Sequence, residues 1–129
     1  MPRALSRASR ILGWLILAAV TVATVAPIGY RPVSTMPVSL ERFSAFAALA
    51  FLLSLGYPRH RWQILALTIG AAGLLEAMQL LEPTRHGRIA DFLVKVVGCG
   101  CGAAAALAAG LLWPRIAGAR DEAGASRLS

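Results

Sequence analysis

Three charged side chains and a nearby amide interrupt two largely apolar stretches of the sequence, residues 62–81 and 89–113, and these side chains are Glu76, Gln79, Asp91 and Lys95. Carboxylates, an amide and an ammonium group can exchange protons, bind an ion or pair with one another. A charged side chain within a bilayer is costly and is found mainly where it pairs with another group or takes part in function. We therefore take these residues as the candidate functional site.

The whole chain is apolar enough for a membrane protein. Its 129 residues are 57% hydrophobic and 15% charged, whereas a soluble domain carries about 25% charged residues. The apolar residues are clustered in runs, and a helix needs roughly 20 such residues to cross a bilayer. Because helices satisfy their own backbone in lipid, we predict an all-α membrane bundle with four spans near residues 11–27, 40–57, 62–81 and 89–113.

The predicted membrane domain, residues 11–114, has a short segment on either side. Residues 1–10 form a basic lead, and residues 115–129 are small and polar, so we expect a disordered cytoplasmic tail. The first span also resembles a secretory signal peptide, with arginines before an apolar run that ends in Ala26. Pro27 directly after that point should hinder cleavage, and we expect an uncleaved helix.

The arginines predict the orientation, since Lys and Arg are enriched in cytoplasmic loops. One side of a four-span arrangement carries Arg3, Arg7, Arg10, Arg59, Arg61, Arg115, Arg120 and Arg127. The other side carries Arg31, Arg42, Arg85 and Arg88. We expect both termini in the cytoplasm and the loops 27–40 and 82–88 in the periplasm of a bacterium, with the protein in the inner membrane. The net charge of +7 is explained by these loops and does not indicate nucleic-acid binding.

Small residues recur along the third and fourth spans. The fourth span carries Gly98, Gly102, Ala106 and Gly110 at every fourth position, and the third carries Ala66, Gly70, Gly73 and Ala77. This small-xxx-small pattern lets helix backbones approach closely. We therefore expect these two helices to pack together, with the helix contact made by Gly70, Gly73, Gly98 and Gly102.

The same helical faces carry the polar side chains. At about 100° per residue, Asp91 and Lys95 share a stripe with Gly98 and Gly102. A hairpin closed by residues 82–88 would bring Glu76 and Gln79 to a similar depth near the outer surface, below a basic rim formed by Arg85, His86 and Arg88.

Three interpretations of this group remain open. Lys95 could neutralise Asp91 or Glu76 and fix the helix register, or the group could bind a phosphate or carboxylate under the basic rim. It could also perform acid–base chemistry, with Glu76 or Asp91 as the base. Binding rather than catalysis is our expectation, and no catalytic residue is assigned.

The sequence predicts no metal and no cofactor. Cys99 and Cys101 lie two positions apart and so point to different sides of a helix, and His60 and His86 fall on opposite sides of the membrane. The chain has no glycine-rich phosphate loop, zinc-ligand spacing or nucleophile elbow.

The polar residues also resemble a motif of the VanZ-like family of small bacterial membrane proteins. That motif has the form E-x-x-Q, then P-x-R, then D-x-x-x-N-x-x-G-x-x-x-G, and the matching residues are Glu76, Gln79, Pro83, Arg85, Asp91, Gly98 and Gly102. Lys95 replaces the asparagine. Glu41-Arg42 resembles an acidic–basic pair at the start of an earlier helix, with Ala45 in place of a histidine. The resemblance covers about residues 40–110 and implies several membrane helices and a role in the cell envelope.

Taken together, these patterns predict a periplasm-facing pocket that binds an anionic lipid headgroup or a lipid-linked cell-wall precursor. Its expected ligand-binding residues are Glu76, Gln79, Arg85, Arg88, Asp91 and Lys95. Glu41 and Arg42 could join them from the second helix. One alternative is an accessory subunit that docks other membrane subunits through its small-residue faces. Another is an intramembrane hydrolase or transferase.

Overall fold

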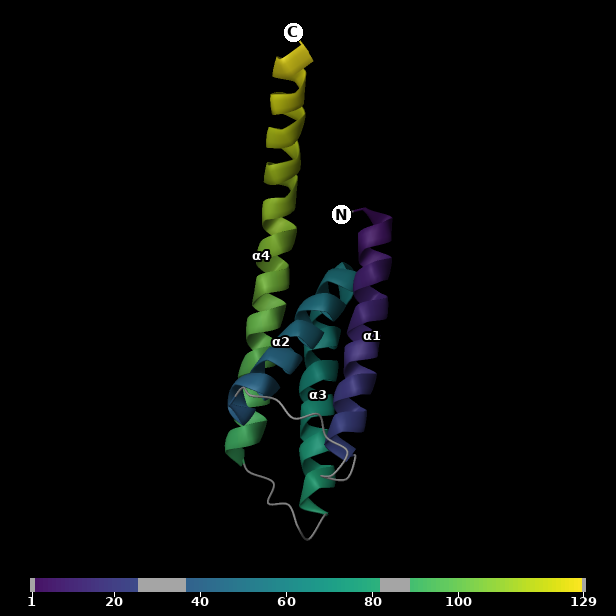
Figure 1. The fold of residues 1–129 in the computed structure, drawn as a ribbon, viewed down its shortest axis with the longest axis vertical. Coiled ribbons are helices and arrows are strands. Elements are labelled where there is room, and N and C mark those ends of the chain that lie inside the picture. Colours follow the sequence, from purple (N-terminus) through teal and green to yellow (C-terminus); the bar gives the residue numbers. More distant parts are fainter. Residues whose placement is uncertain (1, 26–36, 82–88, 129) are drawn as a thin grey trace.

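The computed structural model describes residues 2–25, 37–81 and 89–128. Within these ranges the elements are α1 (Arg3–Val25), α2 (Val38–Gly56), the 3-10 turn η2 (Pro58–His60), α3 (Arg61–Leu80) and α4 (Ile89–Leu128) (Figure 1). Four of these helices are long and apolar enough to cross a membrane, and no strand occurs in the described ranges. The predicted all-α architecture with four helices of membrane-spanning length is therefore confirmed.

Proline sets the boundaries around α2. Pro37 stands immediately before the helix and Pro58 opens the 3-10 turn after it, at positions where a missing backbone N–H is tolerated. The backbone N–H of Tyr57 donates to the carbonyl of Leu53 at 2.9 Å and completes the last turn of α2. The chain can then reverse direction into α3 within three residues.

Helices α1 and α3 run in one direction through the bundle, and α2 and α4 run in the other (Figure 1). The start of α1 and the end of α4 consequently lie at the same end, and the starts of α2 and α4 lie together at the opposite end. Helix α2 crosses the bundle obliquely, so that it begins beside α4 and ends beside α1. This central position makes α2 the element on which the others pack.

Two glycines bring the backbones of α2 and α4 into direct contact. A Cβ atom added to Gly98 would lie 2.7 Å from the carbonyl oxygen of Phe43, and one added to Gly102 would overlap the carbonyl oxygen of Ala47. Both contacts advance by four residues in the same direction along each helix, which is the pattern of a parallel pair. Only glycine permits this approach, because the obstructing atoms belong to the backbone.

The partner of the glycine stripe differs from the sequence prediction, which paired α4 with α3. Gly70 has no atom within 4 Å of an added Cβ, and Gly73 meets only the ring of Phe92 at an ordinary 3.4 Å. Spacing identifies which face of a helix is small, but it does not identify the helix that this face meets. Here the parallel neighbour α2 takes that place, and Gly70 stays exposed.

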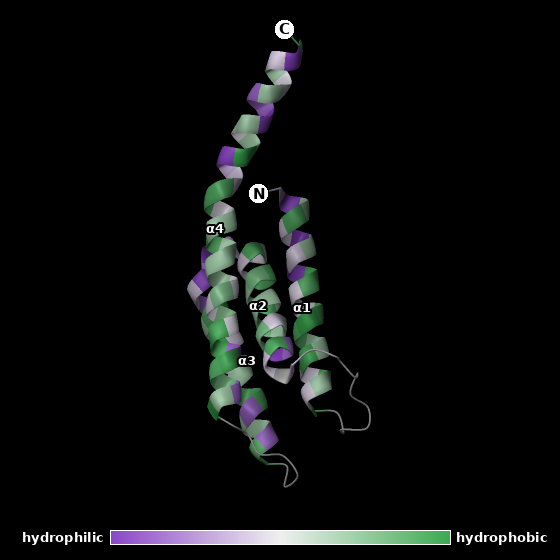
Figure 2. Cartoon of the chain, turned by 60° about the vertical axis from the view of Figure 1, so that its left-hand side comes forward, coloured by the Kyte–Doolittle hydropathy of each residue, from purple (hydrophilic) through white to green (hydrophobic). Residues whose placement is uncertain are grey.

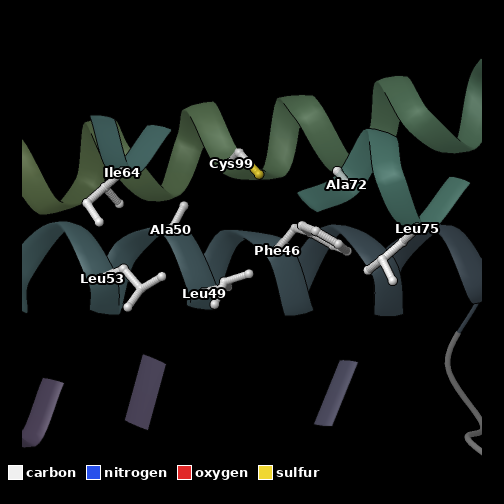
Figure 3. Packing of buried hydrophobic residues seen from close by; sticks show 8 residues of the cluster. All are labelled: Phe46, Leu49, Ala50, Leu53, Ile64, Ala72, Leu75 and Cys99. Atoms are coloured by element: carbon white, nitrogen blue, oxygen red, sulfur yellow. The ribbon is translucent and has the colours of Figure 1, made fainter. Parts of the chain in front are cut away.

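The hydrophobic core surrounds α2 (Figure 3). Its inward side chains pack against α3 and α4, and the buried cluster consists of Phe46, Leu49, Ala50, Leu53, Ile64, Ala72, Leu75 and Cys99. Partly buried side chains of α1 cover the cluster from the other side, namely Ile16, Leu17 and Val20. Many other large apolar side chains are exposed, as expected for helices whose outer faces meet lipid.

Helix α1 is joined to the end of α2 by specific contacts. The Arg10 Nε donates to the carbonyl oxygen of Gly56 at 2.6 Å, and the guanidinium lies 4.5 Å from the centre of the Tyr57 ring. The Trp14 Nε1 donates to the Tyr57 hydroxyl at 3.2 Å. Gly13 is buried against the Leu53 side chain. The question of signal-peptide cleavage stays a prediction, since Ala26 and Pro27 lie outside the described residues.

The segment expected to be a disordered tail is helical to Leu128, as part of the 40-residue helix α4. Alanine, arginine and glutamate favour helix, and the exposed Pro114 does not end it. At about 1.5 Å per residue α4 is about 60 Å long, roughly twice the hydrocarbon thickness of a bilayer. Its last turns therefore project beyond the bundle, and this end carries many hydrophilic residues (Figure 2).

The two kinds of glycine on α4 provide a direct test of the packing. We expect Gly102→Ala to destabilise the protein by about 1–3 kcal/mol, because a new methyl group is forced against the Ala47 backbone. Gly100→Ala is the matched control, since nothing lies within 4 Å of that position. Thermal unfolding of both variants in detergent measures the difference. Equal stability of the two would contradict the close contact of α2 and α4.

Candidate functional site

A buried ion pair joins α3 to α4. The Lys95 Nζ donates to the Glu76 Oε2 at 2.7 Å, and the side chains of Lys95 and Glu76 are only 3% and 9% exposed. The ammonium nitrogen also lies 5.8 Å from the centre of the Phe46 ring, which comes from α2. Of the two partners considered for Lys95, the structure selects Glu76. The pair thus ties the last two helices together and lies against the core.

A second ion pair lies nearer the start of the helices and joins α2 to α4. The Arg42 Nη1 pairs with the Asp91 Oδ2, and about a quarter of each side chain remains exposed. Arg42 therefore joins the polar group from the second helix. Glu41, its neighbour, is exposed and forms no ion pair with another described residue.

The two pairs form an outer and an inner layer, because Lys95 follows Asp91 by about one turn of α4. The inner pair is enclosed by protein and the outer pair is partly open. Each pair contains one cation and one anion, so the group as a whole has no net charge. We call these four residues the double ion pair: Arg42, Asp91, Glu76 and Lys95.

The remaining expected ligand-binding residues fall into two groups. Gln79 is buried on α3, three residues after Glu76 and on the same inward side. Arg85 and Arg88, together with Pro83 and His86, lie outside the described residues. Their expected position in a basic rim above the pocket stays a prediction.

The packing glycines also separate into two groups. Gly98 and Gly102 follow Asp91 on α4 by about two and three helical turns, and they hold α2 against that helix. Gly73 touches the Phe92 ring, and Gly70 is exposed. The close helix contact is therefore made by the α4 glycines, and it aligns Arg42 with Asp91.

The double ion pair is arranged differently from a metal site. In the part of the chain that the structure describes, no group of three or more His, Cys, Asp or Glu residues is placed to hold a metal ion. Cys99 is buried and Cys101 is exposed, and both thiols are free. The chemistry available is exchange of ion-pair partners: a charged ligand could compete for the partly open pair, whereas the enclosed pair stays fixed.

Comparisons of the chain with family models, with curated proteins and with solved structures find no match. The resemblance to the VanZ-like family therefore stays a prediction that depends on the motif residues. In the structure two of those residues, Glu76 and Asp91, lie in ion pairs between different helices.

The contacts between α1 and α2 were not predicted from the sequence. Ser9 and Gly13 are small and four residues apart, and both are buried against the rest of the bundle. That spacing is the small-xxx-small signal already used for the later helices, and it could have identified the packed face of α1. The hydrogen bond from Arg10 to Gly56 had no comparable signal, since an arginine near a predicted span is ordinarily assigned to the headgroup region.

The inner ion pair should show strong energetic coupling. Lys95→Met and Glu76→Gln each remove one charge of the buried pair and leave the opposite charge in an apolar interior, which is costly. We expect the double variant to lose less stability than the sum of the two single variants, with a coupling energy of about 0.5–3 kcal/mol. Thermal or denaturant unfolding in detergent gives the cycle.

The outer pair supplies the matched control cycle, with Arg42→Gln and Asp91→Asn. Its coupling should be smaller, because partly exposed pairs contribute less than enclosed ones. Additive single variants at Lys95 and Glu76 would show that their contact does not contribute to stability.

Proposed function

We propose that this chain is an inner-membrane protein of the VanZ-like type that binds an anionic group of the cell envelope at its periplasmic face. The ligand class is a lipid headgroup or a lipid-linked cell-wall precursor with a phosphate or carboxylate. The observation that carries the proposal is the layered double ion pair, in which Arg42–Asp91 is partly open above the enclosed Lys95–Glu76. An ion pair that is open on one side can exchange its anion without unfolding the helices around it.

Arg42 is the group that receives the ligand in this proposal. A guanidinium has five N–H donors and binds carboxylate or phosphate in a two-point geometry. An incoming anion competes with Asp91 for these donors, while Glu76 and Lys95 keep α3 and α4 in register. Arg85 and Arg88 contribute further positive charge in this proposal, because the loop that carries them joins α3 to α4.

The charges also support the orientation. The start of α1 and the end of α4 lie at one end of the bundle, and the double ion pair lies near the other. The first end carries the larger set of arginines, including Arg3, Arg7 and Arg10 on α1. The positive-inside rule supports a cytoplasmic position for this end, and in this proposal the double ion pair therefore lies at the periplasmic side.

Protein fusions test this orientation. We expect a green fluorescent protein fused after Ser129 to be fluorescent and alkaline phosphatase fused at the same position to be inactive, since both report the compartment of the carboxyl terminus. The control is the same pair of fusions placed after Thr84, in the loop that should be periplasmic, where the two signals should be reversed. Active phosphatase after Ser129 would contradict the proposed topology.

A second candidate function is that of an accessory subunit in a larger membrane complex. The observation in its favour is the small-residue face of α3, where Ala66, Gly70 and Ala77 are exposed and Gly70 has no neighbour within 4 Å of an added Cβ. The small face of α4 is already occupied by α2. A helix that docks through a small-residue face would therefore meet α3. The hydrolase or transferase alternative has less support, because both carboxylates considered as bases are held in ion pairs.

Ligand-dependent stability tests the binding proposal. We expect undecaprenyl phosphate, a lipid-linked phosphate, to raise the melting temperature of the purified protein by several degrees. This shift should disappear in Arg42→Gln, which lacks the guanidinium. Glu41→Gln is the matched control on the same turn of α2, and it should keep the shift. An undiminished shift in Arg42→Gln would rule out Arg42 as the ligand-binding group.

A further inference from the structure

The opposite end of the molecule contains a basic hollow of about 300 Å³. Its lining comes from the first turns of α1 and from the turn after α2, and consists of Arg3, Ser6, Arg7, Arg10 and Pro58. We call this the basic hollow. It shares no residue with the double ion pair, and it lies near the start of α1 rather than near the starts of α2 and α4.

One wall of the basic hollow is held in place by Arg10. Its guanidinium donates to the Gly56 carbonyl and lies over the Tyr57 ring. A Cβ on Gly56 would lie 2.6 Å from the Arg10 side chain, so this approach requires glycine. The hollow is therefore shaped by fixed contacts between α1 and α2.

The charges around the basic hollow are unbalanced. Arg3, Arg7 and Arg10 follow one another at spacings of four and three, which places them on one face of α1, where like charges repel. They also lie at the positive end of the helix dipole. Neither Arg3 nor Arg7 forms a hydrogen bond or ion pair with another described residue. An anion bound among them would relieve both sources of repulsion.

Helix α1, the end of α2 and the turn after it supply no such anion. No Asp or Glu precedes Glu41, and none occurs between Glu41 and Glu76. Glu41 lies in the first turn of α2, at the opposite end of the bundle from the basic hollow. Arg59 and Arg61 add further positive charge next to Pro58. The balancing negative charge must then come from outside these segments.

The depth of the basic hollow indicates where the anion comes from. Trp14 and Tyr57, which follow the lining residue Arg10 and precede the lining residue Pro58 in the sequence, are hydrogen-bonded to each other, and Trp and Tyr are enriched at the membrane–water interface. Arg10, one turn before Trp14, therefore lies at the level of the headgroups. Phosphate groups of lipids occupy the same level, and basic pockets between membrane helices are suited to them.

We propose that the basic hollow is a phosphate-binding site for an anionic phospholipid. This lipid belongs to the leaflet around the end of the bundle where α1 begins. The guanidinium groups of Arg3 and Arg7 donate to the phosphate oxygens, Ser6 supplies a hydroxyl donor, and Arg10 presents its positive charge from the side of α2. The bound lipid fastens α1 to the turn between α2 and α3. A soluble phosphate compound has the same chemistry, and the experiment separates the two sources.

The test uses the full-length protein in detergent with phosphatidylglycerol, phosphatidylcholine or inorganic phosphate as the probe. Native mass spectrometry measures retained lipid, and calorimetry measures phosphate binding. We expect phosphatidylglycerol to be retained in preference to phosphatidylcholine. In the double variant Arg3→Gln/Arg7→Gln its affinity should fall about 30-fold, or about fivefold for each arginine. Arg10 is left unchanged because it holds α1 to α2.

The matched control is Arg115→Gln/Arg120→Gln, which removes the same charge from the projecting part of α4 and should change affinity less than twofold. A loss of phosphatidylglycerol in the hollow variant alone supports the lipid site. A loss of inorganic phosphate binding in that variant alone supports the same site with a soluble ligand. Equal behaviour of both variants with every probe would overturn the proposal, provided that their melting temperatures match the unmodified protein. Arg42 is present in both variants, so the result is independent of the periplasmic site.

Discussion

The contact between the backbones of α2 and α4 is the constraint on which the rest of the structure depends. Gly98 and Gly102 let the two helices meet at Phe43 and Ala47, closer than any residue with a Cβ would permit. Because the helices are parallel, their first turns are side by side, and Arg42 meets Asp91 there. The same approach places the Phe46 ring near the Lys95 ammonium. Packing of small residues thus determines where the charges lie.

The charged side chains at the two ends of the bundle have different kinds of partner. At one end the described cations Arg42 and Lys95 each pair with an anion from another helix, and the pair further from the start of α4 is the more completely enclosed. At the other end the arginines of α1 form no ion pair with an acidic side chain among the described residues, and we propose that they bind a phosphate group from outside the chain. The first arrangement holds helices together from within. In our proposal, the second makes α1 sensitive to the composition of the surrounding leaflet.

Much of the fold could be predicted from the sequence, because uninterrupted apolar runs bounded by Pro37 and Pro58 leave little choice of secondary structure. Glu76 and Lys95 could be recognised as a group for the same reason, since isolated charges in lipid require partners. The helix that packs on Gly98 could not be predicted, because the periodicity of one helix does not identify its neighbour. The helical tail after Pro114 was missed since a small, polar composition is compatible with both helix and disorder.

The parallel pairing of α2 and α4 has a consequence for how the protein is made. Arg42 leaves the ribosome well before Asp91, and at about 5–20 residues per second the delay is roughly 3–10 seconds. During this interval α2 is already synthesised, but the helix that covers its backbone and neutralises its arginine does not yet exist. The nascent α2 must therefore stay near the headgroups or beside the insertion machinery. Final assembly can begin only when the last helix is complete.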